Sequence, residues 1–307
     1  MGSTPQPLIV DIKENSLDDG PGIRSVVFFK GCPLSCVWCH NPECIGKDVE
    51  LSYDASTCVQ SGECVKACKE DALSLGKTLV IDTGRCTACF DCVSACPSGA
   101  LSKMGESMSV QELVARLCKD KPFFDNSGGG VTLSGGEPTY FMDYLCELLQ
   151  ALKRQDIHTL LQTCGAFSFP TFERLVYPHL DLIYYDLKLA DPQAHKQYCG
   201  AANETILDNF IRLHAMALDG GVEVLPRIPL IVGITDTVTN LGTIAAFLRK
   251  HGVEKVQLMP YNPLWRQKVD KLGLRSRFVA ASSNWMTRDQ IEACADVFRR
   301  VSVDVLP

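Results

Sequence analysis

Short apolar runs alternate along the chain with stretches in which apolar residues recur at helical spacing. The runs are rich in β-branched and aromatic residues and end at Gly, Pro or polar residues, which is typical of buried strands. They predict strands at residues 25–29, 130–134, 158–163, 181–187, 222–228 and 254–259. The intervening stretches predict helices at residues 109–119, 140–153, 170–177, 204–219, 237–251 and 287–300.

Two of these helices carry recognisable start signals. Ser109 is followed three residues later by Glu112, the pattern of a capping box. Thr287 precedes the last helix, and Asp289 places a negative charge near its positive end. Six strand–helix repeats predict an α/β fold whose parallel sheet curls into a partial (β/α)6 barrel of the TIM type. In such barrels the active-site groups sit at the C-terminal ends of the strands.

Residues 51–102 interrupt this alternation. They are rich in Cys, Gly and Asp, with little helical periodicity, and they contain two similar halves, Cys58–Leu75 and Cys86–Leu101. A short internal repeat built around cysteine indicates a small inserted metal domain. We therefore expect a discontinuous core of residues 1–50 and 103–307 with an insert at 51–102.

Composition narrows the class of protein. The chain has 307 residues, of which 46% are hydrophobic and 21% charged, which is typical of a globular protein and not of a disordered one. A net charge of −6 and the lack of a basic run argue against nucleic-acid binding. No apolar stretch reaches membrane-spanning length, and the N-terminus lacks the features of a secretory signal.

Cysteine is far more frequent than usual. Of the 16 cysteines, 11 lie between Cys32 and Cys96, and a chain of this length without a signal peptide is no disulfide scaffold. The cysteines therefore predict metal thiolates in a reducing cytoplasm. Cys32, Cys36 and Cys39 form a C-x3-C-x2-C triplet directly after the first strand; three thiolates can hold three corners of a [4Fe–4S] cubane and leave the fourth iron open. The alternative is structural zinc, with Cys44 or His40 as fourth ligand.

The surroundings of the triplet carry a family resemblance. The stretch from Asp19-Gly20-Pro21-Gly22-Ile23-Arg24 through Cys39-His40-Asn41, with Trp38 before the third Cys, closely resembles the signature of glycyl-radical-enzyme activating enzymes. These belong to the radical S-adenosylmethionine superfamily, so the resemblance implies its partial barrel. It covers nearly the whole chain.

The resemblance also implies a cofactor site at the strand ends. Cys32, Cys36 and Cys39 would hold the cluster that binds S-adenosylmethionine. Further residues are expected beside the cofactor: Trp38, the Gly135-Gly136-Glu137 turn, Thr163, Asp186, Lys188 and Arg227. In the family the Gly-Gly-Glu turn hydrogen-bonds the methionine amino group, and its glycines leave room for close backbone approach.

Two positions depart from the family pattern or fit it loosely. Gln162 stands where one branch has an acidic residue beside a monovalent cation, which leaves that cation open. Asp186 and Lys188 could instead form only a salt bridge within the barrel. Asn262 follows the sixth strand, where some members place a His, or it simply forms a loop turn before Pro263.

The insert contains the bacterial ferredoxin run C-x2-C-x2-C-x3-C-P at Cys86, Cys89, Cys92 and Cys96. Because the fourth Cys of one run ligates the other cluster in two-cluster ferredoxins, Cys86, Cys89 and Cys92 should share a cluster with Cys68. Cys58, Cys64 and Cys96 remain for a second cluster, where Ser61 replaces the fourth Cys. Ser61 could ligate by oxygen, Cys44 could move in, the cluster could be [3Fe–4S], or it could be absent; we favour a cubane with a non-standard fourth ligand.

The activity that the resemblance implies is reductive cleavage of S-adenosylmethionine to methionine and a 5′-deoxyadenosyl radical, which abstracts hydrogen from a backbone glycine of a partner glycyl radical enzyme. Activators with a ferredoxin insert serve dehydratases, decarboxylases, C–N lyases and fumarate-adding enzymes, so we expect a partner of these classes and not a pyruvate formate-lyase. We further expect a monomer in an anaerobic cytoplasm, reduced by a flavodoxin or ferredoxin. The alternatives are a radical enzyme acting on a small molecule or another peptide, and an iron–sulfur electron carrier.

Two further expectations concern residues outside these motifs. Partner recognition should involve the barrel mouth and its surface loops, including the segment between Trp265 and Trp285. Five single cysteines are expected to be small buried hydrophobes: Cys118, Cys146, Cys164, Cys199 and Cys294.

Overall fold

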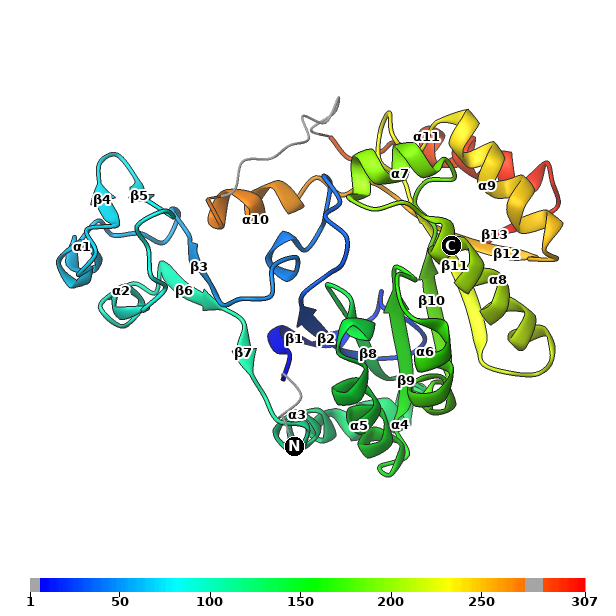
Figure 1. The fold of residues 1–307 in the computed structure, drawn as a ribbon, viewed down its shortest axis with the longest axis horizontal. Helices are drawn as coiled ribbons and strands as arrows, with labels where there is room; N and C mark the ends of the chain where they lie inside the picture. The colour runs from blue at the N-terminus through cyan, green and yellow to red at the C-terminus, as the bar shows by residue number, and fades with distance from the viewer. Residues whose placement is uncertain (1–5, 274–283, 307) are drawn as a thin grey trace.

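The fold is built on one nine-stranded sheet in a computed structural model that describes residues 6–273 and 284–306. Seven strands are mutually parallel, and each lies beside the next one in the chain's barrel order (Figure 1). They are β2 (Arg24–Lys30), β8 (Gly130–Gly135), β9 (His158–Thr163), β10 (Leu182–Asp186), β11 (Glu223–Pro229), β12 (Lys255–Met259) and β13 (Asp304–Leu306). Each of the six predicted strands is present with its ends within one residue of the expected ones.

Three strands of the large sheet, β1, β7 and β13, escaped prediction. β1 (Leu8–Ser16) pairs antiparallel with β2, and the two-residue β7 (Glu106–Ser107) pairs antiparallel with β1. β1 carries the charged residues Asp11, Lys13 and Glu14 and so lacks the apolar run of a buried parallel strand. β7 and β13 are too short to show a pattern. The sheet is open between β7 and β13, which makes the predicted α/β partial barrel correct.

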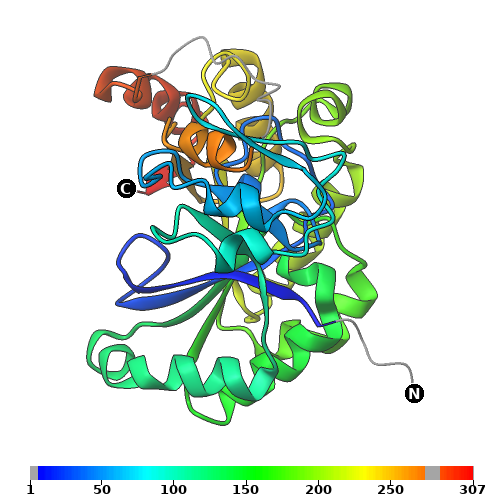
Figure 2. The ribbon, with the colours of Figure 1, turned by 90° about the vertical axis from the view of Figure 1, so that its left-hand side faces the viewer.

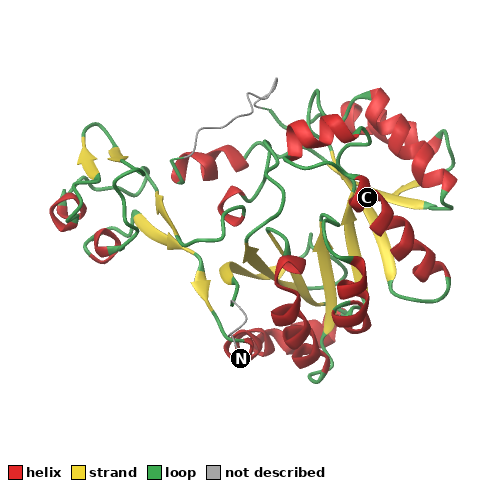
Figure 3. Ribbon diagram, viewed as in Figure 1, coloured by secondary structure: helices red, strands yellow, loops and turns green. Residues whose placement is uncertain are grey.

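Helices cover the convex side of this sheet (Figures 1 and 3). The six predicted helices are present with ends within two residues: α3 (Val110–Leu117), α5 (Met142–Lys153), α6 (Phe169–Leu175), α8 (Glu204–Leu218), α9 (Val238–Lys250) and α11 (Arg288–Arg299). Both start signals are confirmed, because Ser109 and Thr287 each form a complete capping box. Three short helices were not expected: α4 (Lys121–Ser127), α7 (Pro192–Cys199) and α10 (Trp265–Lys271).

The main core lies between the sheet and these helices. Val27, Leu133 and Ile183 on the strands, and Leu145 and Leu148 on α5, are fully buried. Burial on this scale stabilises the sheet by roughly 25 cal/mol per Å² of apolar surface. The sheet is therefore rigid, and the C-terminal ends of its parallel strands lie together along one edge of it.

Residues between β3 (Glu50–Tyr53) and β6 (Leu101–Met104) form a separate small unit. These two strands pair antiparallel and lead the chain into and out of it. Inside are α1 (Glu63–Ala67), α2 (Asp91–Ser94) and a hairpin of β4 (Leu73–Leu75) and β5 (Leu79–Ile81). The unit has its own core of Cys64, Leu73, Leu79, Cys92 and Leu101. It projects from the barrel in Figure 1 and faces the viewer in Figure 2.

None of the helices in the described part of the chain combines the length and apolar character needed to cross a membrane.

Candidate active site

A cavity of about 560 Å³ opens at the C-terminal ends of the parallel strands. This volume falls in the range typical of small-molecule and cofactor sites. The six parallel strands β2, β8, β9, β10, β11 and β12 all contribute to its lining, directly or through the loop that follows them. The predicted residues that line it are Cys32, Cys36, Trp38, Cys39, Gly135, Gly136, Thr163, Asp186, Lys188 and Arg227.

The loop that carries the three cysteines is held in place by backbone hydrogen bonds on both sides. The Gly31 amide donates to the Cys44 carbonyl at 2.8 Å, and the Cys32 amide donates to Ile45 at 3.1 Å. On the other side, the Ser35 amide donates to the Cys199 carbonyl at 2.8 Å. The loop therefore presents its three thiols to the cavity as a fixed set.

The electrostatic surroundings of these thiols differ. Burial raises the pKa of the Cys39 thiol, so its thiolate needs a compensating positive charge such as a ligated iron. A hydrogen bond from the Cys164 thiol lowers the pKa of Cys32. The contact between Cys36 and Cys199 runs the other way: the Cys36 thiol donates to Cys199, which raises the pKa of Cys36 and lowers that of Cys199.

Sequence reasoning missed these two contacts. Cys164 and Cys199 are buried in the main core, as expected, and in addition they contact the thiols of the cluster loop. The position of Cys164 directly after Thr163, at a strand end, was a signal that could have identified it. Cys199 ends a helix that the sequence did not reveal, so no comparable signal existed.

The Gly-Gly-Glu turn packs tightly under the cluster loop. The Gly136 amide donates to the Phe29 carbonyl and the Glu137 amide to the Gly31 carbonyl, each at 2.8 Å. A Cβ on Gly136 would lie 2.3 Å from the Gly31 carbonyl oxygen, and one on Gly135 would lie 2.3 Å from the Phe29 amide nitrogen. Both glycines are required by this close approach of backbone to backbone.

Glu137 takes a different place from its two neighbours. Its carboxylate is fully buried and does not line the cavity. Oε1 accepts hydrogen bonds from the hydroxyls of Thr139 and Thr163 at 2.7 and 2.9 Å, and Oε2 accepts from the Cys164 amide at 2.7 Å. Glu137 thus fastens the end of β8 to the end of β9, and in this structure it positions Thr163.

Asp186, Lys188 and Arg227 form one charged group on the cavity wall. Asp186 Oδ1 accepts from Arg227 Nη2 at 3.1 Å, and Oδ2 accepts from Lys188 Nζ at 3.2 Å. Burial alone would raise the pKa of Asp186, but the two neighbouring cations lower it. Asp186 in turn raises the pKa of Lys188 against the effect of burial. The group therefore carries two positive charges and one negative charge, which leaves one positive charge for an anionic ligand.

Other polar groups complete the lining. The Gln162 amide accepts from Ser134 Oγ at 2.7 Å and donates to Asp19 Oδ1 at 3.2 Å, so it is fully engaged. Asn262 lines the cavity while its Oδ1 accepts from the Leu264 amide at 2.9 Å, as a loop turn would require. His40 Nε2 is buried and has no hydrogen-bond partner within the described residues, although the ring lines the cavity.

The segment between Trp265 and Trp285 includes residues 274–283, which lie outside the described part of the chain. Trp265, the first residue of α10, is buried, and its indole nitrogen donates to Tyr261 Oη at 3.2 Å. Trp285 is exposed and lines the cavity.

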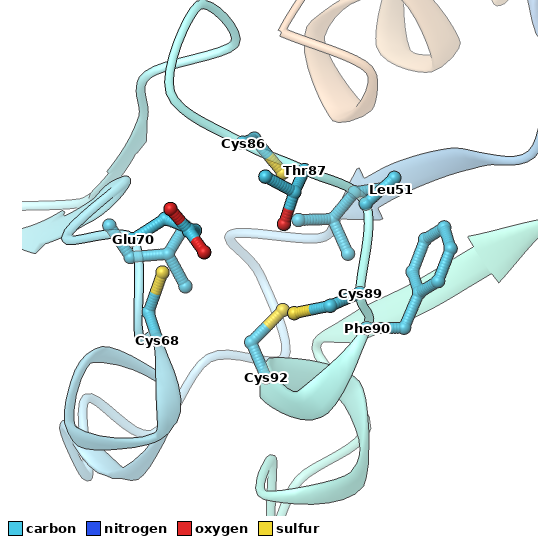
Figure 4. Close-up of a pocket in the computed structure, with 10 residues that line it drawn as sticks. Leu51, Cys68, Glu70, Cys86, Thr87, Cys89, Phe90 and Cys92 are labelled. Atoms are coloured by element: carbon cyan, nitrogen blue, oxygen red, sulfur yellow. The ribbon is translucent and has the colours of Figure 1, made fainter.

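The insert contains two further cysteine-lined cavities. In the first, Cys68 approaches from one side and Cys86, Cys89 and Cys92 from the other, with their sulfur atoms turned toward a shared space (Figure 4). The second is lined by Cys58, Ser61, Cys64 and Cys96. Cys44 lies elsewhere, fully buried beside the barrel cavity. Among the described residues, no three His, Cys, Asp or Glu side chains are grouped tightly enough for a single metal ion. A cluster is larger than an ion and needs thiols spread around a cavity.

Comparison with known proteins gives the following findings. Residues 50–97 match the family of 4Fe-4S dicluster domains. The chain is 41% identical to the trans-4-hydroxy-L-proline dehydratase activating enzyme of Clostridioides difficile, over 87% of this chain and 88% of that protein. It is 39% identical to the isethionate sulfite-lyase activating enzyme of Nitratidesulfovibrio vulgaris strain Hildenborough, over 84% of this chain and 85% of that protein.

Among solved structures, a domain of the pyruvate-formate lyase-activating enzyme from Bacteroides vulgatus is similar to 58% of this chain. The match covers 98% of that domain at 26% identity, with a TM-score of 0.46.

Proposed function

Because this chain belongs to the activating enzymes of glycyl radical enzymes, we propose that the cavity at the strand ends is its active site. The protein is a radical S-adenosylmethionine enzyme that carries 4Fe–4S clusters. The proposal rests on one observation: three thiols and a charged group with one net positive charge line the same cavity.

The residues present fit the cofactor. Cys32, Cys36 and Cys39 provide three thiolates and leave a fourth iron free for a ligand. Lys188 and Arg227 offer one uncompensated positive charge, which suits the carboxylate of the methionine moiety.

When bound, the cluster supplies the electron that splits S-adenosylmethionine into methionine and a 5′-deoxyadenosyl radical, which removes a hydrogen atom from a partner's glycine. The chain's own residues bind, orient and shield. Lys188 and Arg227 hold the methionine carboxylate, and the backbone of Gly135 and Gly136 faces the amino group. Glu137 holds Thr163 in place, and Trp38 helps to exclude water.

We propose a domain division in which the core spans 1–50 and 103–307 and the insert spans 51–102. The insert would hold up to two clusters and pass electrons from a flavodoxin or ferredoxin to the barrel cluster. Helix α10 supports this arrangement, because Lys268 binds Glu43 beside the cluster loop at 2.7 Å and Lys271 binds Asp54 of the insert at 2.7 Å. A monovalent cation near Asp186 is the least supported part, because both oxygens of that carboxylate already accept from cations.

The partner belongs to the dehydratase, decarboxylase, C–N lyase or fumarate-adding classes in this proposal, and not to the pyruvate formate-lyases. One of the two relatives above is named as the activator of a dehydratase, which is among these classes. The other is named as the activator of a sulfite-lyase, which is outside them and is not a pyruvate formate-lyase either. In this proposal the enzyme works as a monomer. Its compartment is an anaerobic cytoplasm, because exposed thiolate clusters require a reducing environment.

The test is anaerobic reconstitution with iron and sulfide, followed by reduction with dithionite and measurement of 5′-deoxyadenosine. We expect Cys36→Ala to abolish the product. Cys146→Ala, on α5 and away from the cavity, should retain it.

Incubation with candidate partners should then give a glycyl radical signal in electron paramagnetic resonance (EPR). A full 5′-deoxyadenosine yield from Cys36→Ala would refute the proposed site. Turnover without a partner radical would favour a small-molecule or peptide substrate.

A further inference from the structure

The two halves of the insert fold alike, residue by residue. Gln60 and Ala88 both adopt a left-handed backbone conformation, with φ of 54° and 53°. Gly62 and Phe90 do the same, with φ of 76° and 63°, and each is followed by a short helix. Between them lie Ser61 in one half and Cys89 in the other. Ser61 thus occupies the backbone position that presents a thiol in the other half.

The linings of the two cavities match in the same way. Cys58 corresponds to Cys86, Cys64 to Cys92, and Cys96 to Cys68. Corresponding positions also agree in their exposure to solvent: Cys64 and Cys92 are both buried, and Ser61 and Cys89 are both exposed. One cavity therefore presents four thiols, and the other presents three thiols and a hydroxyl.

Within residues 6–273 and 284–306, no other side chain supplies the missing thiol. Cys44 is fully buried beside the barrel, and its carbonyl accepts from the Gly31 amide. Ser98 also lines the second cavity, but it stands where Glu70 stands in the first, a position that the complete thiol set does not use. The Tyr53 hydroxyl already accepts from the Leu79 amide at 3.3 Å.

Ser61 is itself a poor replacement for a thiolate. A serine hydroxyl must lose its proton to bind iron as a cysteine does, and its reach is shorter than that of a thiol. Its Oγ also accepts a hydrogen bond from the Glu63 amide at 3.4 Å. Solvent has direct access to the position because Ser61 is exposed.

We propose that the second site of the insert holds a cluster on three thiolates, Cys58, Cys64 and Cys96, whose fourth iron lies beside Ser61 and is labile. Oxidation then converts a [4Fe–4S]2+ cluster into [3Fe–4S]+. One electron passes to the added oxidant, ferricyanide, and one Fe2+ leaves, while the four sulfides and three thiolates stay. The first site of the insert, with four thiolates, keeps its iron under the same treatment. This inference goes beyond the proposed function, because it concerns the insert alone.

The barrel site also has three thiolates, so it must be removed before the experiment. In a Cys32→Ala/Cys36→Ala/Cys39→Ala background, the reconstituted chain should bind about eight iron atoms, all in the insert. After ferricyanide oxidation we expect about seven iron atoms and about one [3Fe–4S]+ EPR signal per chain. Ser61→Cys in this background should reduce that signal at least tenfold.

The repeat provides a matched control. Cys89→Ser, at the equivalent position of the other half, should create a second labile iron and raise the signal to about two per chain. If the triple variant fails to fold, the unmodified chain and Ser61→Cys can be compared directly, with about two and about one signals expected.

Three outcomes would overturn the inference. The first is an oxidised background that keeps eight irons and shows no such signal. The second is a signal that Ser61→Cys leaves unchanged. The third is a background that binds only four irons, because the second site would then be empty. None of these outcomes depends on cleavage of S-adenosylmethionine, so the proposed function is tested separately.

Discussion

At the scale of single residues, the active-site cavity depends on one group of charges. Lys188 is largely buried on the cavity wall and contacts Asp186, which Arg227 also contacts. Truncating one member of such a buried group leaves the remaining charges poorly compensated, so its effects on ligand binding exceed those of a surface pair.

We expect Lys188→Met to weaken S-adenosylmethionine binding at least about tenfold, because the remaining Arg227 charge is then largely neutralised by Asp186. Equilibrium binding to the anaerobic, iron-loaded chain measures the effect, with iron content determined in parallel. Lys121→Met, which removes a surface pair with Asp125, is the control and should leave affinity unchanged. Unchanged affinity in an iron-loaded Lys188→Met chain would remove Lys188 from the ligand site.

Gly136 is a cavity residue at which a single added methyl group should destabilise the chain. Gly136→Ala places a Cβ against the Gly31 carbonyl, and we expect a loss of about 2 kcal/mol in the free energy of unfolding. Gly242→Ala, on the α9 helix with open space around it, should instead stabilise the chain by up to about 1 kcal/mol. Chemical denaturation of both variants measures these changes. Equal changes in the free energy of unfolding would contradict the prediction.

At the scale of elements, local start signals fix where helices begin. Ser109 accepts from the Glu112 amide at 3.2 Å and completes a capping box for α3. Ser168 occupies the same position before α6 but makes no side-chain hydrogen bond to that helix's backbone. The same residue type therefore contributes differently in two helices of one chain.

This difference gives a paired prediction. Ser109→Ala should lower the free energy of unfolding by about 1 kcal/mol, because the Glu112 amide loses its acceptor. Ser168→Ala should cost clearly less. Denaturant titrations of the two variants provide the comparison, and a larger cost for Ser168→Ala would show that the capping bond does not control the stability of α3.

At the scale of the whole molecule, the insert and the barrel meet around the cluster loop. Helix α10 contacts Glu43 next to that loop and Asp54 of the insert. If the insert relays electrons, removing its complete cluster should affect only those reductants that must enter through it.

We therefore expect Cys86→Ala/Cys92→Ala to reduce 5′-deoxyadenosine formation at least tenfold when a flavodoxin is the reductant. With dithionite, a small molecule that can reach the barrel cluster directly, the yield should be retained. Cys118→Ala is the control, because Cys118 belongs neither to the barrel triplet nor to the cysteines of the insert. Equal yields with both reductants would assign the insert to docking and not to electron transfer.

The sequence predicted the elements well where a single local pattern decided them. Each parallel strand from β2 to β12 is a short apolar run because it is buried by helices or strands around it, and its ends fell within one residue of expectation. β1, α7 and α10 were missed because each is stabilised by its place in the fold. β1 pairs along β2, and α7 holds the cluster loop through Cys199 and Tyr198.

By itself, the sequence determined the order of strands and helices, the family resemblance and the spacing of the thiols, since all three are properties of residues close together in the chain. Only the tertiary structure decided that Glu137 turns away from the cavity to hold Thr163, that Cys164 and Cys199 reach the cluster loop, and that Cys44 lies apart from the insert. These facts depend on which side chains meet across the sheet and between distant segments. Those side-chain contacts are determined by the packing of the whole chain, and the local spacing of residues does not encode them.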